Sequence, residues 1–242
     1  MILPLAKLGI EGTGSMGDDT PMPVLSKQSR SLYDYFRQQF AQVTNPPIDS
    51  LREASVMSLE TCLGVERNLF DESSLHAGRL ILESPILSNQ VFKKLLSYHK
   101  KGFPGDTLSI HYDKNIDLEE AINTICDRAV RSVKKGNVLI ILSDQGLNKD
   151  QLTIPAAMAV GAVHHRLINE GVRCDCNIIV ETASTWNSHH FAVLLGYGAS
   201  AIYPYLAFNI INDLIVRNSV DTKAYALHVQ NFIKGINKGL LK

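Results

Sequence analysis

Two uninterrupted apolar runs of strand length most restrict what this chain can fold into. Residues 138–142 have the sequence VLIIL, and residues 176–181 contain the run IIV. A strand whose successive side chains are all apolar is buried on both faces, which is typical of a parallel sheet covered by helices on both sides. The two runs therefore indicate an α/β fold.

The pattern around these runs alternates between strands and helices. Further strands are expected at 79–82, 107–112 and 199–203, and the strand–helix unit occurs four or five times, fewer than the eight of a complete barrel. The sequence predicts parallel strand–helix repeats that form either a partial, rudimentary TIM-barrel-like structure or an open sheet. Helices are expected at 89–99, 117–135, 155–169, 189–196, 208–218 and 222–238.

The first part of the chain has a different composition. Residues 9–17 contain four glycines, and Pro21 and Pro23 follow, which predicts turns and irregular backbone. Within 29–43, apolar side chains recur at steps of three and four residues, typical of a helix. We expect residues 1–53 to form an irregular Gly/Pro-rich arm with one helix, in the same single domain as an α/β body at 54–242.

Charge and hydropathy exclude several classes of partner. Lysine plus arginine and aspartate plus glutamate are balanced at 24 each, so the basic stripe needed to bind nucleic acid or an anionic membrane is not expected. No stretch approaches the roughly 18 consecutive apolar residues of a membrane span, and no signal peptide is evident. Four scattered cysteines indicate free thiols. The sequence predicts a cytoplasmic protein.

Two neighbouring N-terminal motifs are candidate chemical sites. The glycine-rich string at 12–17 follows no strand, and Asp18 and Asp19 come directly after it, where they would repel a phosphate. The two aspartates precede Thr20 and Pro21, which is common turn chemistry. We expect a structured turn here rather than a cofactor site or a catalytic pair.

A second set of residues resembles a metal site. Cys174 and Cys176 are separated by only one residue, which places their side chains on opposite faces of an extended segment, and His189 and His190 are adjacent on a helix. Zinc sites favour two to four residues between cysteines. We expect no catalytic, cofactor-binding or metal-binding residue from these motifs.

Polar residues follow both apolar strands. Ser143 and Asp144 come after the first, and Glu181 and Thr182 come after the second. The carboxyl ends of parallel strands are where α/β proteins build sites, although caps and turns also require polar residues there. A self-sufficient small-molecule enzyme and a ligand-binding module using these loops both remain possible.

Longer strings resemble the central domain of the large (alpha) chain of glutamate synthase. They are GSMGDDTP (14–21), YDYFRQQFAQVTNPPID (33–49), LRE (51–53), LSD (142–144), AVGA (159–162), NIIVETAS (177–184), HHFAVLLG (189–196), AIYPYL (201–206) and GINKGL (235–240). The resemblance covers essentially the whole chain. It implies a piece of a much larger enzyme whose central domain resembles a rudimentary form of the synthase barrel.

The resemblance also implies what surrounds this domain. In the family, a glutaminase releases ammonia, which crosses a tunnel to a synthase domain. There it combines with 2-oxoglutarate, and FMN and an iron–sulfur cluster support reduction to L-glutamate. The glutaminase nucleophile is an N-terminal cysteine, whereas this chain has Met1, and no closely spaced cysteine triplet is present. We expect a catalytically inactive connecting domain without cofactors of its own, with the glutaminase and FMN synthase domains as partners.

A connecting domain of this kind is expected to line part of the ammonia tunnel. Thr44 and Asn45 offer neutral hydrogen-bonding groups, and the two prolines that follow restrict φ. Ser15 and Met16 lie in a glycine-flanked turn that allows close backbone approach. We expect these four residues at the tunnel wall, although the double proline is equally expected of a simple helix stop.

Overall fold

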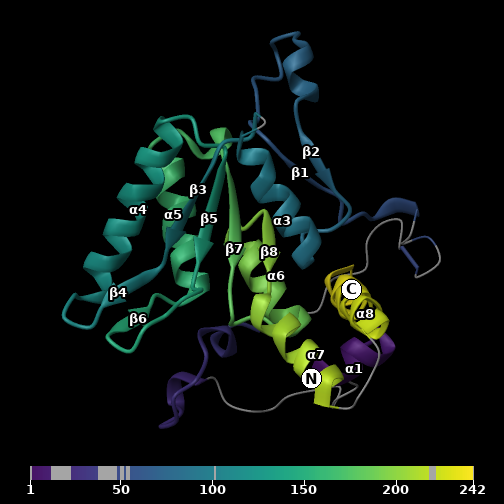
Figure 1. The fold of residues 1–242 in the computed structure, drawn as a ribbon. Coiled ribbons are helices and arrows are strands. Elements are labelled where there is room, and N and C mark those ends of the chain that lie inside the picture. The colour runs from purple at the N-terminus through teal and green to yellow at the C-terminus, as the bar shows by residue number, and fades with distance from the viewer. Residues whose placement is uncertain are drawn as a thin grey trace.

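The computed structural model describes residues 2–11, 23–37, 48–49, 52, 55–100, 102–217 and 222–241 (Figure 1). The strands are β1 (Thr61–Leu63), β2 (Leu80–Leu82), β3 (Gly105–Ser109), β4 (His111–Asp113), β5 (Leu139–Ser143), β6 (Gln151–Thr153), β7 (Asn177–Glu181) and β8 (Ala201–Tyr203). The helices are α1 (Ile2–Leu8), α3 (Asn89–Ser97), α4 (Leu118–Lys134), α5 (Ala156–Asn169), α6 (Ser188–Gly196), α7 (Tyr205–Arg217) and α8 (Thr222–Leu241). Short 3-10 turns are η1 (Pro23–Leu25), η2 (Leu32–Tyr35), η3 (Ser74–Ala77), η4 (Tyr98–Lys100) and η5 (Arg173–Asp175).

The central sheet contains the two apolar runs at its middle. Its strand order is β3-β5-β7-β8, and every pairing is parallel. All residues of β5 and β7 are buried, as the apolar runs at 139–142 and 178–180 predict for the middle of each strand. Beside β8, a parallel bridge joins Ile86 to Ile202, so residues 85–87 extend this side of the sheet. The α/β fold with parallel strand–helix repeats is confirmed.

Helices cover both faces of the sheet (Figure 1). Ile140 and Ile178 belong to the core that α4, α5 and α6 complete on one face. On the other face, Ile141 and Ile179 join a core that includes Phe92 of α3 and residues of the antiparallel β1–β2 pair. The chain moves along the sheet from β3 to β8, whereas α3 leads from residues 85–87 back to β3. Right-handed crossovers in opposite directions place their helices on opposite faces.

Among the described residues the sheet is open rather than closed into a ring. β3 pairs with β5 at one edge, and residues 85–87 lie beside β8 at the other. Of the two arrangements expected from the sequence, the open sheet is the one that the described residues form.

The predicted strand at 107–112 is divided in two. β3 ends at Ser109, and the buried Ile110 donates its N–H to the carbonyl of Ser143 over 3.0 Å. β4 then leaves the sheet and pairs antiparallel with β6. The sequence pattern could not show this change of partner, because both halves have the composition of a strand.

The predicted strand at 79–82 exists as β2 but lies outside the parallel sheet. It pairs antiparallel with β1, and Cys62 lies opposite Ile81. Because residues 48–76 show no clear periodicity, the sequence did not reveal β1 as its partner.

The predicted helix at 29–43 is wrong in its described part. Only the 3-10 turn η2 forms there, with Ser31 as its N-cap, and Phe36 is extended, with φ −105° and ψ 143°. Tyr33, which is outside the predicted apolar face, is the buried residue, whereas Tyr35 of that face is 40% exposed. Tertiary contacts of Tyr33 override the local periodicity. Residues 38–43 lie outside the described residues.

The other predicted helices are present as α3 to α8, with ends within a few residues of expectation. Asp117 caps α4 by accepting the N–H of Glu119 over 2.8 Å, as its position predicts. Gly136 follows α4 with a φ of 94°, in the left-handed region that glycine tolerates best.

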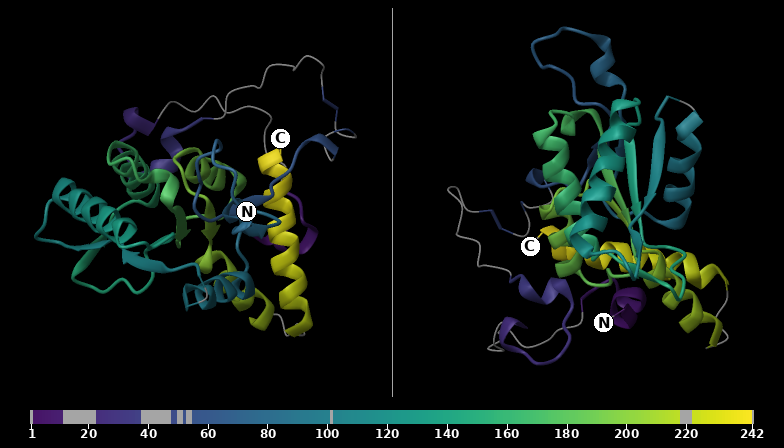
Figure 2. Two further views of the ribbon diagram at one scale, coloured as in Figure 1. Left: turned by 90° about the horizontal axis from the view of Figure 1, so that it is seen from above. Right: turned by 90° about the vertical axis from the view of Figure 1, so that its left-hand side faces the viewer.

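A further helix, α1, lies in the segment for which irregular backbone was expected. It packs against α8 so closely that a Cβ added to Gly235 would meet Leu5 Cδ2 at 2.5 Å. Figure 2 shows α1 and α8 together, on the other side of the molecule from α4. The glycine in the middle of α8 thus permits the approach that holds the N-terminal helix to the body.

Candidate functional site

The polar residues predicted at the strand ends lie side by side. Parallel pairing places Ser143 of β5 opposite Glu181 of β7. The Ser143 hydroxyl donates to Glu181 Oε2 over 2.6 Å, and both side chains are buried. This contact is the floor of a polar network at the carboxyl ends of the central strands.

Asp144 connects the loops that follow these strands. Its carboxylate accepts the hydroxyl of Thr182 over 2.5 Å and the backbone N–H of Ala183 over 2.9 and 3.1 Å. Its carbonyl accepts His111 Nε2 over 2.9 Å and the hydroxyl of Tyr205 over 3.4 Å. Asp144 thus joins β4, β5, the β7–α6 loop and α7.

The network continues to the N-terminal segment through Tyr33. The Tyr33 hydroxyl lies 2.9 Å from Ser184 Oγ, which lies 2.9 Å from Thr182 Oγ1. The Tyr33 carbonyl accepts His189 Nε2 over 2.9 Å, and its ring stacks on His190 with centroids 4.4 Å apart. The turn η2 is therefore fixed to the loop after β7 by side-chain, backbone and ring contacts.

Burial controls the titration of these groups. It raises the pKa of Glu181, and the Asp144 charge raises it further against the opposing hydrogen bond from Ser143. It also raises the pKa of Tyr33 to about 12 and lowers the pKa of His190 to about 4. His190 is therefore neutral near pH 7. The Ser143–Glu181 pair is shielded from solvent.

Replacing His190 with glutamine should reduce the amount by which the free energy of unfolding falls on acidification. An unfolded histidine binds a proton below about pH 6.5, whereas folded His190 does so only near pH 4. The unfolded state therefore binds more protons between these values, and stability falls on acidification through the window by roughly 3 kcal/mol at most. Urea unfolding from pH 7 to 4 should show a difference between wild type and His190→Gln that shrinks as the pH falls.

Leu227→Gln, at an exposed position of α8 that carries no titratable group, provides the control. It should leave the loss of stability between pH 7 and 4 as large as in wild type. Parallel curves for wild type and His190→Gln would contradict the assignment of this loss to His190.

The cysteine and histidine motifs do not come together. Cys174 is exposed and Cys176 is buried, and all four cysteines of the chain are free. Among the described residues, no group of three His, Cys, Asp or Glu side chains is placed to hold a metal ion. Within the same ranges, no helix is both long and apolar enough to cross a membrane.

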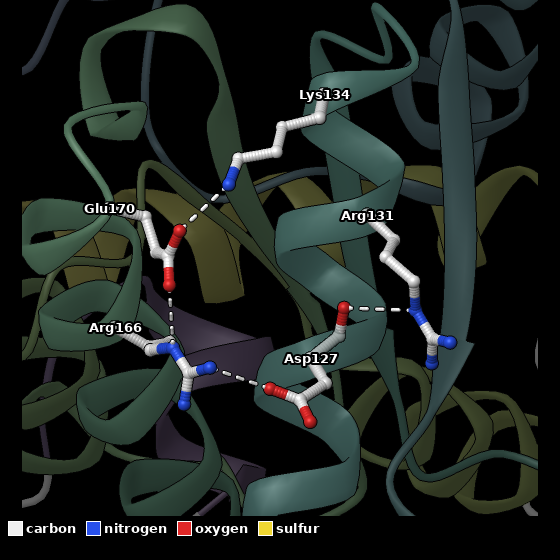
Figure 3. Close-up of polar contacts among 5 residues, drawn as sticks. All are labelled: Asp127, Arg131, Lys134, Arg166 and Glu170. Carbon is white, nitrogen blue, oxygen red and sulfur yellow. Dashed lines mark hydrogen bonds and ion pairs between the residues drawn. The ribbon is translucent and has the colours of Figure 1, made fainter.

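The charged residues of α4 and the α5 C-terminus pair with one another (Figure 3). Lys134 Nζ lies 2.7 Å from Glu170 Oε2, and Arg166 contacts Asp127 at 2.7 Å and Glu170 at 3.3 Å. The hydrogen bond and charge of Lys134 lower the pKa of Glu170. Exposed pairs of this kind contribute little to stability. They tie two helices together and leave no one-signed patch among these residues.

The predicted residues thus divide into two groups. Ser143, Asp144, Glu181 and Thr182 meet at the strand ends, whereas the tunnel residues and the aspartate pair fall outside the described residues: Ser15, Met16, Asp18, Asp19, Thr44 and Asn45. Sequence reasoning missed four members of the network, because no local spacing connects them to it: Tyr33, His111, His189 and Tyr205.

A comparison with models of protein families shows which family this chain belongs to. The model of the glutamate synthase central domain matches residues 1–242. The chain belongs to the glutamate synthase central-domain family. The resemblance found in the sequence strings is confirmed over the whole chain, and the segment corresponds to the central domain of a glutamate synthase large chain.

Curated relatives agree with this membership. The chain is 45% identical over 210 residues to the ferredoxin-dependent glutamate synthase of Pyropia yezoensis, covering 84% of this chain and 13% of that protein. It is 41% identical to the chloroplastic ferredoxin-dependent enzyme of Oryza sativa subsp. japonica, covering 98% and 16%. It is 39% identical to the glutamate synthase [NADPH] large chain of Bacillus subtilis (strain 168), covering 100% and 16%. The chain therefore matches only 13–16% of the length of these relatives.

A solved structure also resembles part of the chain. A single-residue mutant of flavocytochrome b2 with benzoylformate matches 61% of this chain and 35% of that one, with 14% identity and a TM-score of 0.37.

Proposed function

We propose that this central domain is a connector in a glutamate synthase large chain. It places a glutaminase domain against an FMN-containing synthase domain and lines part of the ammonia tunnel between them. The parent enzyme makes L-glutamate from L-glutamine and 2-oxoglutarate. Family membership and the small share of the relatives' length support a role within a larger polypeptide.

The observation that carries the proposal is a pair of exposed apolar clusters. Leu69 and Phe70 are 90% and 94% exposed, and Val24 and Leu25 are 71% and 77% exposed. Single exposed apolar residues are ordinary, whereas apolar side chains grouped on a surface are typical of sites that bind another protein.

The two clusters lie at opposite ends of the sheet. The loop that carries Leu69 and Phe70 is anchored near the amino end of β7, where the Gly64 N–H donates to Asn177 Oδ1 over 2.6 Å. It projects beyond the sheet at the top of Figure 1. Val24 and Leu25 form η1, which contacts η2, and η2 is held at the carboxyl ends through Tyr33. Two separated apolar surfaces are what a domain between two others requires.

The parent's cofactors do not fit the described residues of this domain. An iron–sulfur cluster needs several cysteine thiolates at one place. Cys126 and Cys176 are buried, Cys62 and Cys174 are exposed, and the described part of the chain has no such cluster. Ligand phosphates commonly bind at the carboxyl ends of strands in α/β proteins, and the Asp144 carboxylate at these strand ends would repel the phosphate of a flavin. We place FMN and the cluster in other domains.

The two alternative functions are less well supported. The groups that an enzyme or ligand module would use at the strand ends are already bonded to one another: Ser143 to Glu181, and Thr182 to Asp144. A ligand would have to replace these contacts.

A double substitution tests the connector. In the full-length enzyme, Leu69→Asp with Phe70→Asp should lower glutamine-dependent glutamate formation more than ammonia-dependent formation, because it disturbs an interface rather than the chemistry. Since both positions are exposed, stability of the isolated domain should change by less than about 0.5 kcal/mol. Leu152→Asp, which changes a half-exposed residue in neither cluster, is the control. The proposal would be contradicted if the double variant kept both the wild-type ratio of glutamine-dependent to ammonia-dependent activity and the wild-type hydrogen exchange at residues 64–79.

A further inference from the structure

A groove of about 860 Å³ lies between β2, α3 and α8. Its lining includes Leu82 of β2, Leu95 of α3, and Val229 and Ile233 of α8. The Ser84 hydroxyl donates to Asn237 Oδ1 over 2.8 Å, which fixes the turn after β2 to α8. The groove is therefore formed in advance by packed elements, which lowers the entropic cost of binding.

The rim of the groove is positively charged. Lys94 on α3 and Lys234 and Lys238 on α8 line it, against one acidic residue, Glu83. Within the described ranges, the ion pairs involve other residues, and none includes these three lysines. An occupant with carboxylates would complement this rim.

Apolar surface at the rim also lacks a cover in the described chain. Ile81 is 66% exposed and Val91 is 39% exposed, and both line the groove. An apolar floor, exposed apolar edges and a basic rim together complement an amphipathic segment that carries acidic residues.

We propose that this groove binds an acidic amphipathic segment from the remaining polypeptide of the same large chain. Apolar side chains of that segment lie on the floor, and its Asp or Glu carboxylates pair with the lysines. The inference rests on the proposed connector function, and it assigns a third contact surface besides the two apolar clusters. The relatives supply the necessary polypeptide, since this domain matches only 16% of most of them.

Site-specific photo-cross-linking in the full-length enzyme tests the groove. A benzoylphenylalanine at Gln230, which is exposed and lines the groove, should cross-link to a segment outside 1–242 that contains Asp or Glu. The same label at Leu227, exposed on α8 but outside the lining, is the matched control. Mixed light and heavy isotope preparations distinguish contacts within one chain from contacts between copies.

Several results would overturn the inference. One is a cross-link from Gln230 to residues 1–242, to a second copy, or to a segment without acidic residues. Another is a cross-linking yield at Gln230 that does not exceed the yield at Leu227. A label at Phe70 separates this failure from failure of the connector function. If Phe70 cross-links to the rest of the chain and Gln230 does not, the connector stands and the groove inference falls; if neither does, both fall.

Charge reversal tests the basic rim. Lys94→Glu with Lys234→Glu and Lys238→Glu should lower the Gln230 cross-linking yield roughly tenfold, which corresponds to about 1.4 kcal/mol. Lys93→Glu, next along α3 but outside the lining, should have little effect. Equal yields in the two variants would overturn the role of the lysines.

Discussion

Replacing Phe232 with alanine is expected to lower the free energy of unfolding of the domain by about 3–5 kcal/mol. Phe232 of α8 is fully buried, with ring centroids 6.4 Å from Phe191 of α6 and 5.8 Å from Phe208 of α7. Its removal leaves a cavity where three helices meet and also removes two edge-on ring contacts. Urea unfolding of the purified domain, followed by far-UV circular dichroism, measures the change.

The same helix provides the control for this prediction. Leu227 is 54% exposed, so Leu227→Ala should change stability by less than about 0.5 kcal/mol. Phe232→Leu should fall between the two, because it keeps part of the buried volume. A loss below about 1 kcal/mol for Phe232→Ala would show that α8 is not part of the cooperative core.

Replacing Thr44 with tryptophan in the full-length enzyme is expected to uncouple its two reactions. If Thr44 lines the ammonia tunnel, a bulky side chain should lower glutamine-dependent glutamate formation roughly tenfold, as about 1.4 kcal/mol on a barrier does. Formation from added ammonia and the FMN content should remain, because the synthase site is unchanged. Steady-state assays with each nitrogen source measure the ratio.

Conservative and neighbouring substitutions sharpen this test. Thr44→Ser keeps a hydroxyl and should retain coupling, whereas Asn45→Trp should uncouple like Thr44→Trp. Ser15→Trp and Met16→Trp test the opposite side of the proposed tunnel. If both activities decline together, or neither changes, these residues do not line the tunnel.

Much of the α/β body could be predicted because its signals are local. The VLIIL run requires burial on both faces wherever it is placed, and Asp117 caps α4 with a side chain two residues from its partner N–H. Ser143, Asp144, Glu181 and Thr182 were found because parallel strands bring their carboxyl ends to one edge.

The remaining features depend on partners distant in the sequence. Tyr33 reaches Ser184 across 151 residues, and this contact replaces a periodic helix with a 3-10 turn. The strand predicted at 107–112 divides at Ile110 because β4 finds β6 instead of the sheet. The groove requires β2, α3 and α8 together, and none of these elements contains a sequence motif that predicts it.

The sequence by itself determined the fold class, the order of the repeats and membership of the glutamate synthase central-domain family. These follow from local burial patterns and from long shared strings, which need no knowledge of distant contacts. Only the tertiary structure decided that the sheet is open, that Tyr33 fixes the N-terminal segment to the strand ends, and that apolar clusters lie at opposite ends. The physical reason is that pairing, closure and exposure are properties of surfaces brought together from separate parts of the chain.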